Sequence, residues 1–187
     1  MLWSATPDGA IDYCNARLLE YSGLSAENIM DGGWVNLLHP DDREPTAQIW
    51  MRCIATGEPY TVEVRQFHVA DHTHRWVLTT ALPLRDADGR IVQWYGSCVD
   101  IHDRKSAEQA LHTSERKLQA IIEAIPALVW SAHADGSADF ANQHYLDYVG
   151  TRMEEMAGWG WTAAVHPNDL PAMTEDWQRI FASGRAG

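Results

Sequence analysis

The residues best able to do chemistry are a few histidines with acidic neighbours. Asp71, His72 and His74 have a spacing that would suit a transition metal. They lie in a polar turn between two predicted strands, where side chains are usually solvated, and no fourth ligand is evident. His39 and His166, each followed by Pro, are candidates for metal or haem ligation, but a hydrogen-bonding turn is the simpler role for both. We therefore predict no metal site.

The arrangements that catalysis usually needs are also absent from the sequence. It contains no nucleophile–base pair and no glycine-rich phosphate loop, so we predict no catalytic residue and no enzyme activity for this chain. The three cysteines are odd in number and form no Cys-x-x-Cys pair: Cys14, Cys53 and Cys98. We expect them to be reduced thiols in a cytoplasmic protein.

Composition and charge exclude several classes of function. The chain has 187 residues, a net charge of −12 and 45% hydrophobic residues, a content typical of globular proteins. An acidic chain without clusters of Lys and Arg is not expected to bind nucleic acid. No apolar run is long enough to span a membrane, and the first residues do not resemble a signal peptide.

The elements that position these residues occur twice. Trp3 corresponds to Trp130, Trp34 to Trp161 and His39 to His166, always at an offset of 127 residues. A period of this length predicts two domains of the same kind in tandem. Counterparts of residues 61–102 would lie beyond residue 187, so we expect the second copy to be truncated and the chain to be a fragment of a longer protein.

The first copy reads as two strands, several short helices, a longer helix and three strands. Asn15 suits the N-cap of a short helix, Pro45 the first turn of the longer one, and Gly57 its end. Antiparallel pairing of the strands, with the helices on one face, buries this pattern economically, which gives an α+β fold. The predicted strands are 1–5, 10–14, 60–69, 75–85 and 90–101.

A charged segment without glycine follows and predicts a long helix over 103–125. Asp103 suits its N-cap and Pro126 ends it. Small and apolar residues recur in it with heptad spacing, which is typical of a helix that pairs with another helix along its length. These residues are Ala107, Leu111, Ser114, Leu118, Ile121 and Ile125.

With both copies and the helix in view, the chain resembles a tandem of PAS domains, the sensory modules of bacterial signalling proteins. The motifs that carry the resemblance are Gly33-Trp34, His39-Pro40-Asp41-Asp42, Arg75-Trp76 and Asp100-Ile101-His102. His102 stands where the subtype usually has Thr. The resemblance implies a sheet order of 2-1-5-4-3, with the helices over its inner face. It divides the chain into a PAS domain (1–102), a signalling helix (103–125) and the front half of a second PAS domain (126–187).

The resemblance also frames the cofactor question, because relatives bind haem, flavin or metabolites, or bind nothing. The segment 34–56 lacks the cysteine motif of flavin photoreceptors, and 45–57 lacks an axial histidine for haem. We therefore predict no cofactor, although an unknown small molecule is possible.

Strand parity taken from relatives gives the residues that should line a pocket. On the third strand Phe67 is expected to face inward, together with Arg65, which would then need an anionic ligand or a carboxylate partner. The alternative, which we favour, is that Trp50 and Trp94 fill the space themselves. Ala81 and Gly96 are also expected to face inward. The pocket candidates are Trp50, Cys53, Ile54, Arg65, Phe67, Val77, Thr79, Val92, Trp94 and Cys98.

The same parity places Trp76, Leu78 and Leu82 on the outer face of the sheet, as an apolar patch. Relatives cover this face with a flanking helix or with a second subunit. We expect a homodimer and a downstream effector domain, most simply a histidine kinase, to which the module relays a signal from a small ligand or through dimerisation. The alternatives are a ligand-free dimerisation module of a diguanylate cyclase or phosphodiesterase, and a sensor that binds flavin or haem.

Overall fold

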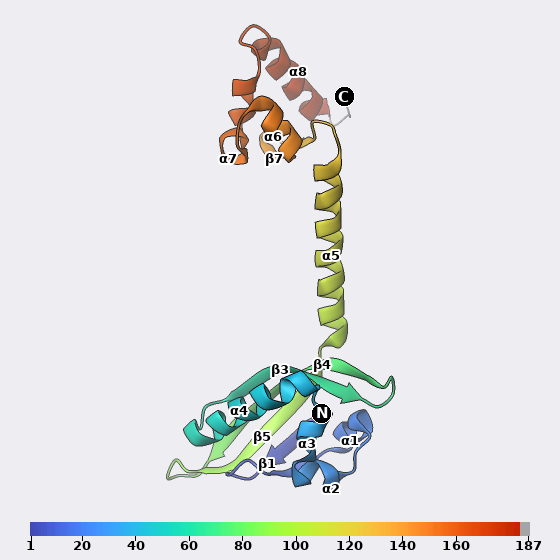
Figure 1. Ribbon diagram of the computed structural model, residues 1–187. Coiled ribbons are helices and arrows are strands. Elements are labelled where there is room, and N and C mark those ends of the chain that lie inside the picture. Colours follow the sequence, from blue (N-terminus) through green and yellow to red (C-terminus); the bar gives the residue numbers. More distant parts are fainter. Residues whose placement is uncertain (184–187) are drawn as a thin grey trace. The chain divides into compact units, whose positions relative to one another are not determined.

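The computed structural model describes residues 1–183, apart from the side chains of residues 31, 178 and 181–183. It divides into two compact units, Met1–Ala110 and a second unit that begins at Leu111 (Figure 1). The last four residues of the predicted second domain, 184–187, lie outside the described residues.

The first unit contains a five-stranded antiparallel sheet of order β2-β1-β5-β4-β3, which confirms the predicted fold. Alternating apolar residues and the Gly-containing turns between them account for the strands. Their bounds are β1 (Leu2–Ala5), β2 (Ile11–Cys14), β3 (Tyr60–His68), β4 (Thr73–Arg85) and β5 (Ile91–Asp100).

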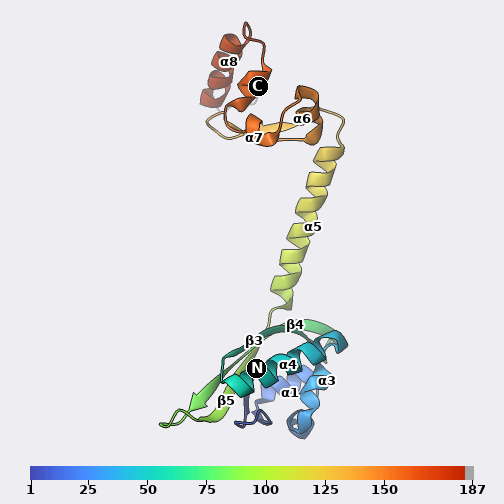
Figure 2. The same ribbon diagram turned by 60° about the vertical axis from the view of Figure 1, so that its left-hand side comes forward.

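Short helices and one long helix cover a single face of this sheet (Figure 2). Asn15 caps the first of them, as predicted, because its side chain accepts a hydrogen bond from the backbone N–H of Leu18. The helical elements are α1 (Ala16–Ser22), α2 (Ala26–Asn28), a π-helical turn (Ile29–Gly33), α3 (Trp34–Leu37) and α4 (Pro40–Thr56).

Helix α4 begins earlier than the sequence analysis placed it. His39 is its N-cap, since His39 Nδ1 accepts a hydrogen bond from the N–H of Asp41, and Pro40 occupies the first turn. Pro45 therefore lies inside the helix, where the prediction of a first-turn proline is wrong. Gly57 ends α4 in the left-handed conformation (φ 70°), as expected.

Aromatic side chains fill the space between α4 and the sheet. Trp50 on α4 makes edge contacts with Trp3, Tyr60 and Trp94, with ring centroids 5.1 to 5.6 Å apart. Trp3 lies so close to β5 that a Cβ at Gly96 would stand 2.1 Å from its ring. Only glycine at position 96 lets this tryptophan lie against the sheet.

Helix α5 (His102–Ala124) follows β5 directly. Asp100 rather than Asp103 caps it, because Asp100 Oδ1 accepts a hydrogen bond of 2.9 Å from the N–H of His102. The predicted cap is therefore wrong by three residues, and Asp103 lies in the first turn instead.

The second unit repeats details of the first at the offset of 127 residues. Trp177 Nε1 donates to the carbonyl oxygen of Gly136, as Trp50 Nε1 does to that of Gly9. Asn142 caps a helix as Asn15 does. The elements are β6 (Trp130–Ala132), β7 (Ala138–Ala141), α6 (Gln143–Val149), α7 (Met153–Met156), a 3-10 helix (Gly160–Ala164) and α8 (Leu170–Ser183), in which Pro171 occupies the first turn.

Candidate functional site

A cavity of about 70 Å³ lies between the inner face of the sheet and helices α1, α3 and α4. Of the predicted pocket residues, Trp50, Thr79 and Cys98 line it. The full lining is Trp3, Ile11, Leu18, Ile29, Trp34, Leu37, Leu38, Thr46, Trp50, Tyr60, Val64, Gln66, Thr79 and Cys98.

Four other predicted pocket residues belong to the core around the cavity without lining it. Cys53, Val77 and Trp94 are buried, and Ile54 packs against them from α4. Trp94 is fully buried and its Nε1 has no hydrogen-bond partner among the described residues. Its ring lies against that of Trp50, so both tryptophans fill space, as the alternative interpretation of the pocket required.

The inward orientation expected for Arg65 and Phe67 is wrong. Tyr60, Val64 and Gln66 are the buried residues of β3, so residues 65 and 67 point the other way. Arg65 donates to both oxygens of Asp42, at 3.0 Å from Nε and 2.6 Å from Nη2. These bonds lower the pKa of the Asp42 carboxyl. The guanidinium charge is therefore compensated within the protein and requires no anionic ligand.

Val92 is a second error of parity, on β5. It is exposed, whereas Ile91 packs against the core. The pairing of Leu84 with Gln93 is followed by that of Arg85 with Ile91, so Val92 is the extra residue of a β-bulge. A bulge reverses the alternation beyond it, and strict alternation could not reveal one.

Three polar side chains that the sequence analysis did not select line the cavity: Thr46, Tyr60 and Gln66. Each residue is 4% exposed, and none of their side-chain polar atoms is among the fully enclosed atoms that lack a partner, so these atoms face accessible space. Burial raises the pKa of the Tyr60 hydroxyl, which is thus a neutral donor. The Cys98 thiol, by contrast, lies 3.4 Å from Thr79 Oγ1, and burial raises its pKa. The alternation of β3 counted from Tyr60 would have placed Tyr60 and Gln66 on the inner face.

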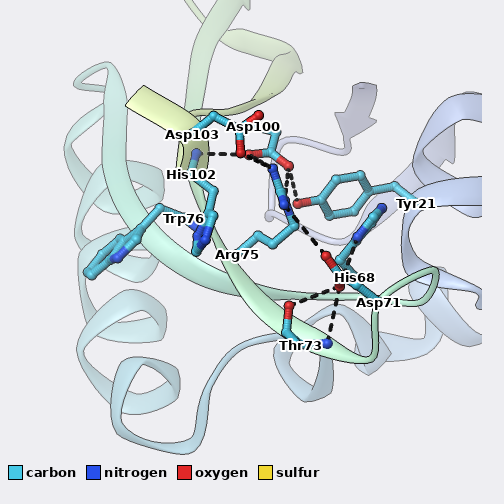
Figure 3. A network of polar contacts seen from close by, with 9 residues as sticks. All are labelled: Tyr21, His68, Asp71, Thr73, Arg75, Trp76, Asp100, His102 and Asp103. Atoms are coloured by element: carbon cyan, nitrogen blue, oxygen red, sulfur yellow. Dashed lines mark hydrogen bonds and ion pairs between the residues drawn. The ribbon is translucent and has the colours of Figure 1, made fainter. Parts of the chain in front are cut away.

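The junction between the sheet and α5 is held by Arg75, at the centre of Figure 3. Its Nε donates to Asp100 Oδ2 at 2.7 Å, and Nη2 donates to Asp103 Oδ1 at 2.8 Å. Its Nη1 lies 3.5 Å from Asp71. Burial opposes ionisation of Asp100, but the bonds from Arg75, His102 and Tyr21 outweigh it, so the pKa of Asp100 is lowered. One guanidinium thus links β4, the end of β5 and the first turn of α5.

Helix α1 reaches the same network through Tyr21. The Tyr21 hydroxyl donates to Asp100 Oδ2 at 2.8 Å, and burial together with that carboxylate raises the pKa of the phenol. The ring contacts His68, whose Nδ1 lies 3.0 Å from Asp71 Oδ1 (Figure 3). Asp71 is desolvated, but bonds from Thr73 and His68 hold its pKa at about 2. Asp71 therefore serves the junction, and the Asp-His-x-His turn is not arranged as a metal cluster.

The first turn of α5 covers part of the outer sheet face. Lys105 Nζ lies 5.1 Å from the ring centre of Trp76, and Arg65 lies 5.7 Å from the same centre. Glu63 pairs with Lys105 and, at 3.5 Å, with Arg104. The prediction of an exposed apolar patch is therefore wrong for Trp76, which is partly covered.

The rest of the outer face is more exposed. Leu82 is 62% and its cross-strand neighbour Tyr95 is 58% exposed. Leu2 and Val99 are also exposed, whereas Leu78 is partly buried. Several apolar side chains are thus exposed on this face of the sheet, which is the type of surface that a partner covers.

Helix α5 exposes the seam that the heptad pattern identified. Leu111, Leu118 and Ile121 are 61%, 58% and 49% exposed, and no residue of α5 is buried. Ile125 follows the end of the helix and is 39% exposed, and Ala107 is also exposed.

No group of three or more His, Cys, Asp or Glu side chains is placed to hold a metal ion within residues 1–183. In that same range, none of the helices is both long and apolar enough to cross a membrane. The three cysteines are buried and unpaired.

The chain is similar to one protein family and to the two relatives described here. Residues 11–98 match the family model described as the PAS fold. The uncharacterised protein y4lL of Sinorhizobium fredii is 34% identical over 96% of this chain and 21% of its own length. The peroxide stress-activated histidine kinase mak1 of Schizosaccharomyces pombe is 28% identical over 90% of this chain and 11% of its own length. The chain thus spans about a fifth or less of these relatives.

The chain is also similar to a solved structure, the N-terminal domain of a diguanylate cyclase with a PAS/PAC sensor from Marinobacter aquaeolei. It is 19% identical, has a TM-score of 0.49, and the match covers 56% of this chain and 96% of that one.

Proposed function

Through its first domain the chain belongs to the PAS fold family, and from that premise we propose that it is a sensory relay module without catalysis of its own. Its parts are a PAS domain (1–102), a signalling helix (103–125) and the front half of a second PAS domain (126–187). A histidine kinase is the effector that the similarity to mak1 favours for the whole protein. Association with a diguanylate cyclase or phosphodiesterase is the less favoured alternative. The cytoplasmic location stays a prediction.

The observation that supports a relay is the short connection from the cavity to α5 through helix α1 and two hydrogen bonds. Leu18 of α1 lines the cavity. Tyr21, one turn later on the same helix, donates to Asp100, and Asp100 caps α5 through the N–H of His102. A ligand that shifts Leu18 would move the Tyr21 hydroxyl and alter the cap of the signalling helix. This connection through α1 and Asp100 is sufficient to carry a signal from the cavity to the start of α5.

The output of the relay is a change in how two chains pair. The exposed seam of α5 buries apolar surface only against a second helix, and its heptad spacing suits a parallel pair. The seam is short and contains Ala107 and Ser114, which bury little, so the pairing is weak and easily altered by a movement at Asp100. The exposed outer sheet face around Leu82 and Tyr95 supplies a second contact, between the first domains of the two paired chains.

Replacement of Leu118 by Asp tests this pairing in the full chain. A carboxylate at a buried seam position has no partner, so we expect the dimer dissociation constant to rise by about a hundredfold, or ~2.8 kcal/mol. Lys117→Asp is the matched control, because it places the same side chain off the seam. Sedimentation velocity over a concentration series measures both. A Leu118→Asp chain that stays dimeric would refute pairing through α5 and favour the outer sheet face.

We also propose that the module works without haem or flavin. Cofactor sites usually have volumes of about 300–1,000 Å³, whereas this cavity has about 70 Å³. Either cofactor would have to displace Trp34, Leu37 or Trp50 from the cavity wall. An absorption band in the visible range that stays with the protein through gel filtration would contradict this.

A further inference from the structure

The inner cavity combines an apolar wall with polar groups that face it. The side chains of Thr46, Tyr60 and Gln66 are each 4% exposed and line the same cavity. None of their polar atoms is among the fully enclosed atoms without a partner, so a molecule that enters the cavity can reach them. A hydrogen bond to such a group contributes about 0.5–1.5 kcal/mol.

The three groups can be placed relative to one another from the strand pairing and the helix. Thr46 is on α4 one turn after Asp42, which contacts Arg65, the residue next to Gln66. Thr46 and Gln66 therefore lie towards the same end of the cavity. Tyr60 lies at the other end of β3, against Trp50. The cavity thus has one end that offers an amide and a hydroxyl, and an aromatic body with a further hydroxyl.

The charge of the cavity restricts what could bind. Among the described residues, no Asp, Glu, Lys, Arg or His lines it. The Arg65 guanidinium is on the opposite face of β3 and is paired with Asp42. The Arg43 guanidinium donates to the carbonyl oxygens of Leu38 and Asn36. An ion placed in the cavity would be desolvated without a counter-charge, which is strongly unfavourable. The occupant is therefore neutral.

The volume restricts its size. An apolar cavity of about 150 Å³ accommodates benzene, so about 70 Å³ has room for roughly three or four non-hydrogen atoms. Water is the simplest occupant, since buried waters satisfy orphaned polar groups. The wall, however, presents mainly aromatic and aliphatic side chains beside the polar ones, and that mixture suits a molecule with a small apolar part as well.

We propose that this cavity binds a small uncharged molecule with an amide or alcohol group, which Gln66 and Thr46 hold by hydrogen bonds while the aromatic wall contacts its apolar part. This specificity rests on the sensory function proposed above and names the class of signal that the domain detects. Gln66 supplies both a donor and an acceptor, so it distinguishes an amide from an apolar molecule of the same size.

Acetamide and acetate make a matched pair of probes, because they have the same shape and number of non-hydrogen atoms and differ in charge. Titration of the full chain is followed by the side-chain amide signals of Gln66 and the indole signal of Trp34 in ¹H–¹⁵N spectra. We expect saturable acetamide binding in the millimolar range, at least tenfold tighter than that of acetate. Equal affinity for the two probes, or no acetamide-dependent shift at either residue, overturns the proposal.

Gln66→Leu distinguishes a binding role from a structural one. It should weaken acetamide binding at least tenfold and leave the urea midpoint unchanged or raised, because the buried amide is replaced by an apolar side chain of similar size. Gln48→Leu, the same change on the exposed side of α4, should alter neither quantity. A Gln66→Leu chain that binds acetamide like the native chain, or that is clearly destabilised, assigns Gln66 to packing and overturns the proposal.

The proposal and the relay function fail separately. If ordered waters fill the cavity and acetamide does not displace them, the ligand class is wrong. The relay function is tested by the dimer dissociation constant of Leu118→Asp, which does not depend on whether the cavity is occupied.

Discussion

Removal of the Arg75 guanidinium should loosen the junction between the sheet and α5. Arg75→Gln leaves Asp100 without its 2.7 Å bond and places three carboxylates near one another without the cation between them: Asp71, Asp100 and Asp103. The Arg75 side chain is only 19% exposed and that of Asp100 is 27% exposed, so their bond is worth more than that of a surface ion pair.

The magnitude follows from the partners. A hydrogen bond between charged groups contributes about 1.5–3 kcal/mol. Asp103 is 90% exposed, so its bond adds little. We expect a loss of about 2 kcal/mol in the free energy of unfolding of the first unit, which is a fall of roughly 1 M in the urea midpoint. The amides of the first turn of α5 should exchange faster as well, because Asp100 caps that turn.

Arg90→Gln is the control for this change. Arg90 lies 3.8 Å from Asp88 and both side chains are at least 75% exposed, so its loss should alter stability by less than about 0.5 kcal/mol. Urea unfolding followed by tryptophan fluorescence measures both variants, and hydrogen exchange reports on α5. If the two variants lose the same stability, or if the first turn of α5 keeps its protection in Arg75→Gln, the junction does not hold the helix.

Two further predictions concern pH and the repeat. Folding lowers the pKa of Asp71, to about 2, and also that of Asp100. The stabilisation from these two carboxylates is therefore complete above pH ~4, the usual carboxyl pKa, and is lost as the pH falls from about 4 towards 2. Urea midpoints measured between pH 6 and pH 2 should fall less steeply for Asp71→Asn than for the native chain, and an unchanged slope would contradict this. Asn142 makes four hydrogen bonds, two through its oxygen and two through its amide, whereas its counterpart Asn15 makes two. Asn142→Ala should therefore destabilise α6 by about 3 kcal/mol and Asn15→Ala should destabilise α1 by about 1 kcal/mol, and equal losses of amide-exchange protection would refute the difference.

The pattern of the sequence was sufficient for the fold because each local signal has a local cause. Asn15 and Gly57 cap and end helices through bonds to residues within four positions. The alternation on β4 placed Val77, Thr79 and Ala81 inward, as the structure has them, because an uninterrupted strand alternates faces strictly. The order of the five strands followed from the resemblance and is what the sheet shows.

The candidate site was predicted only in part, since a single residue of offset reverses a strand. Phe67 was assigned inward from the strand parity of relatives, yet the alternation counted from Tyr60 places it on the outer face. Val92 was misplaced because a bulge adds a residue to β5. Composition does not reveal either error, because the position of a bulge and the face on which a strand's alternation begins depend on the neighbouring strands.

The sequence by itself determined what neighbouring residues along the chain decide: the repeat, the strands and helices, the heptad seam of α5 and the lack of a catalytic motif. Only the tertiary structure decided which distant groups meet. Arg65 meets Asp42 across 23 positions, Arg75 meets Asp100 across 25, and Thr46 and Gln66 are brought to one cavity from a helix and a strand. Such partners are chosen by the packing of α4 and α5 against the sheet, which is a property of the whole fold and of no segment alone.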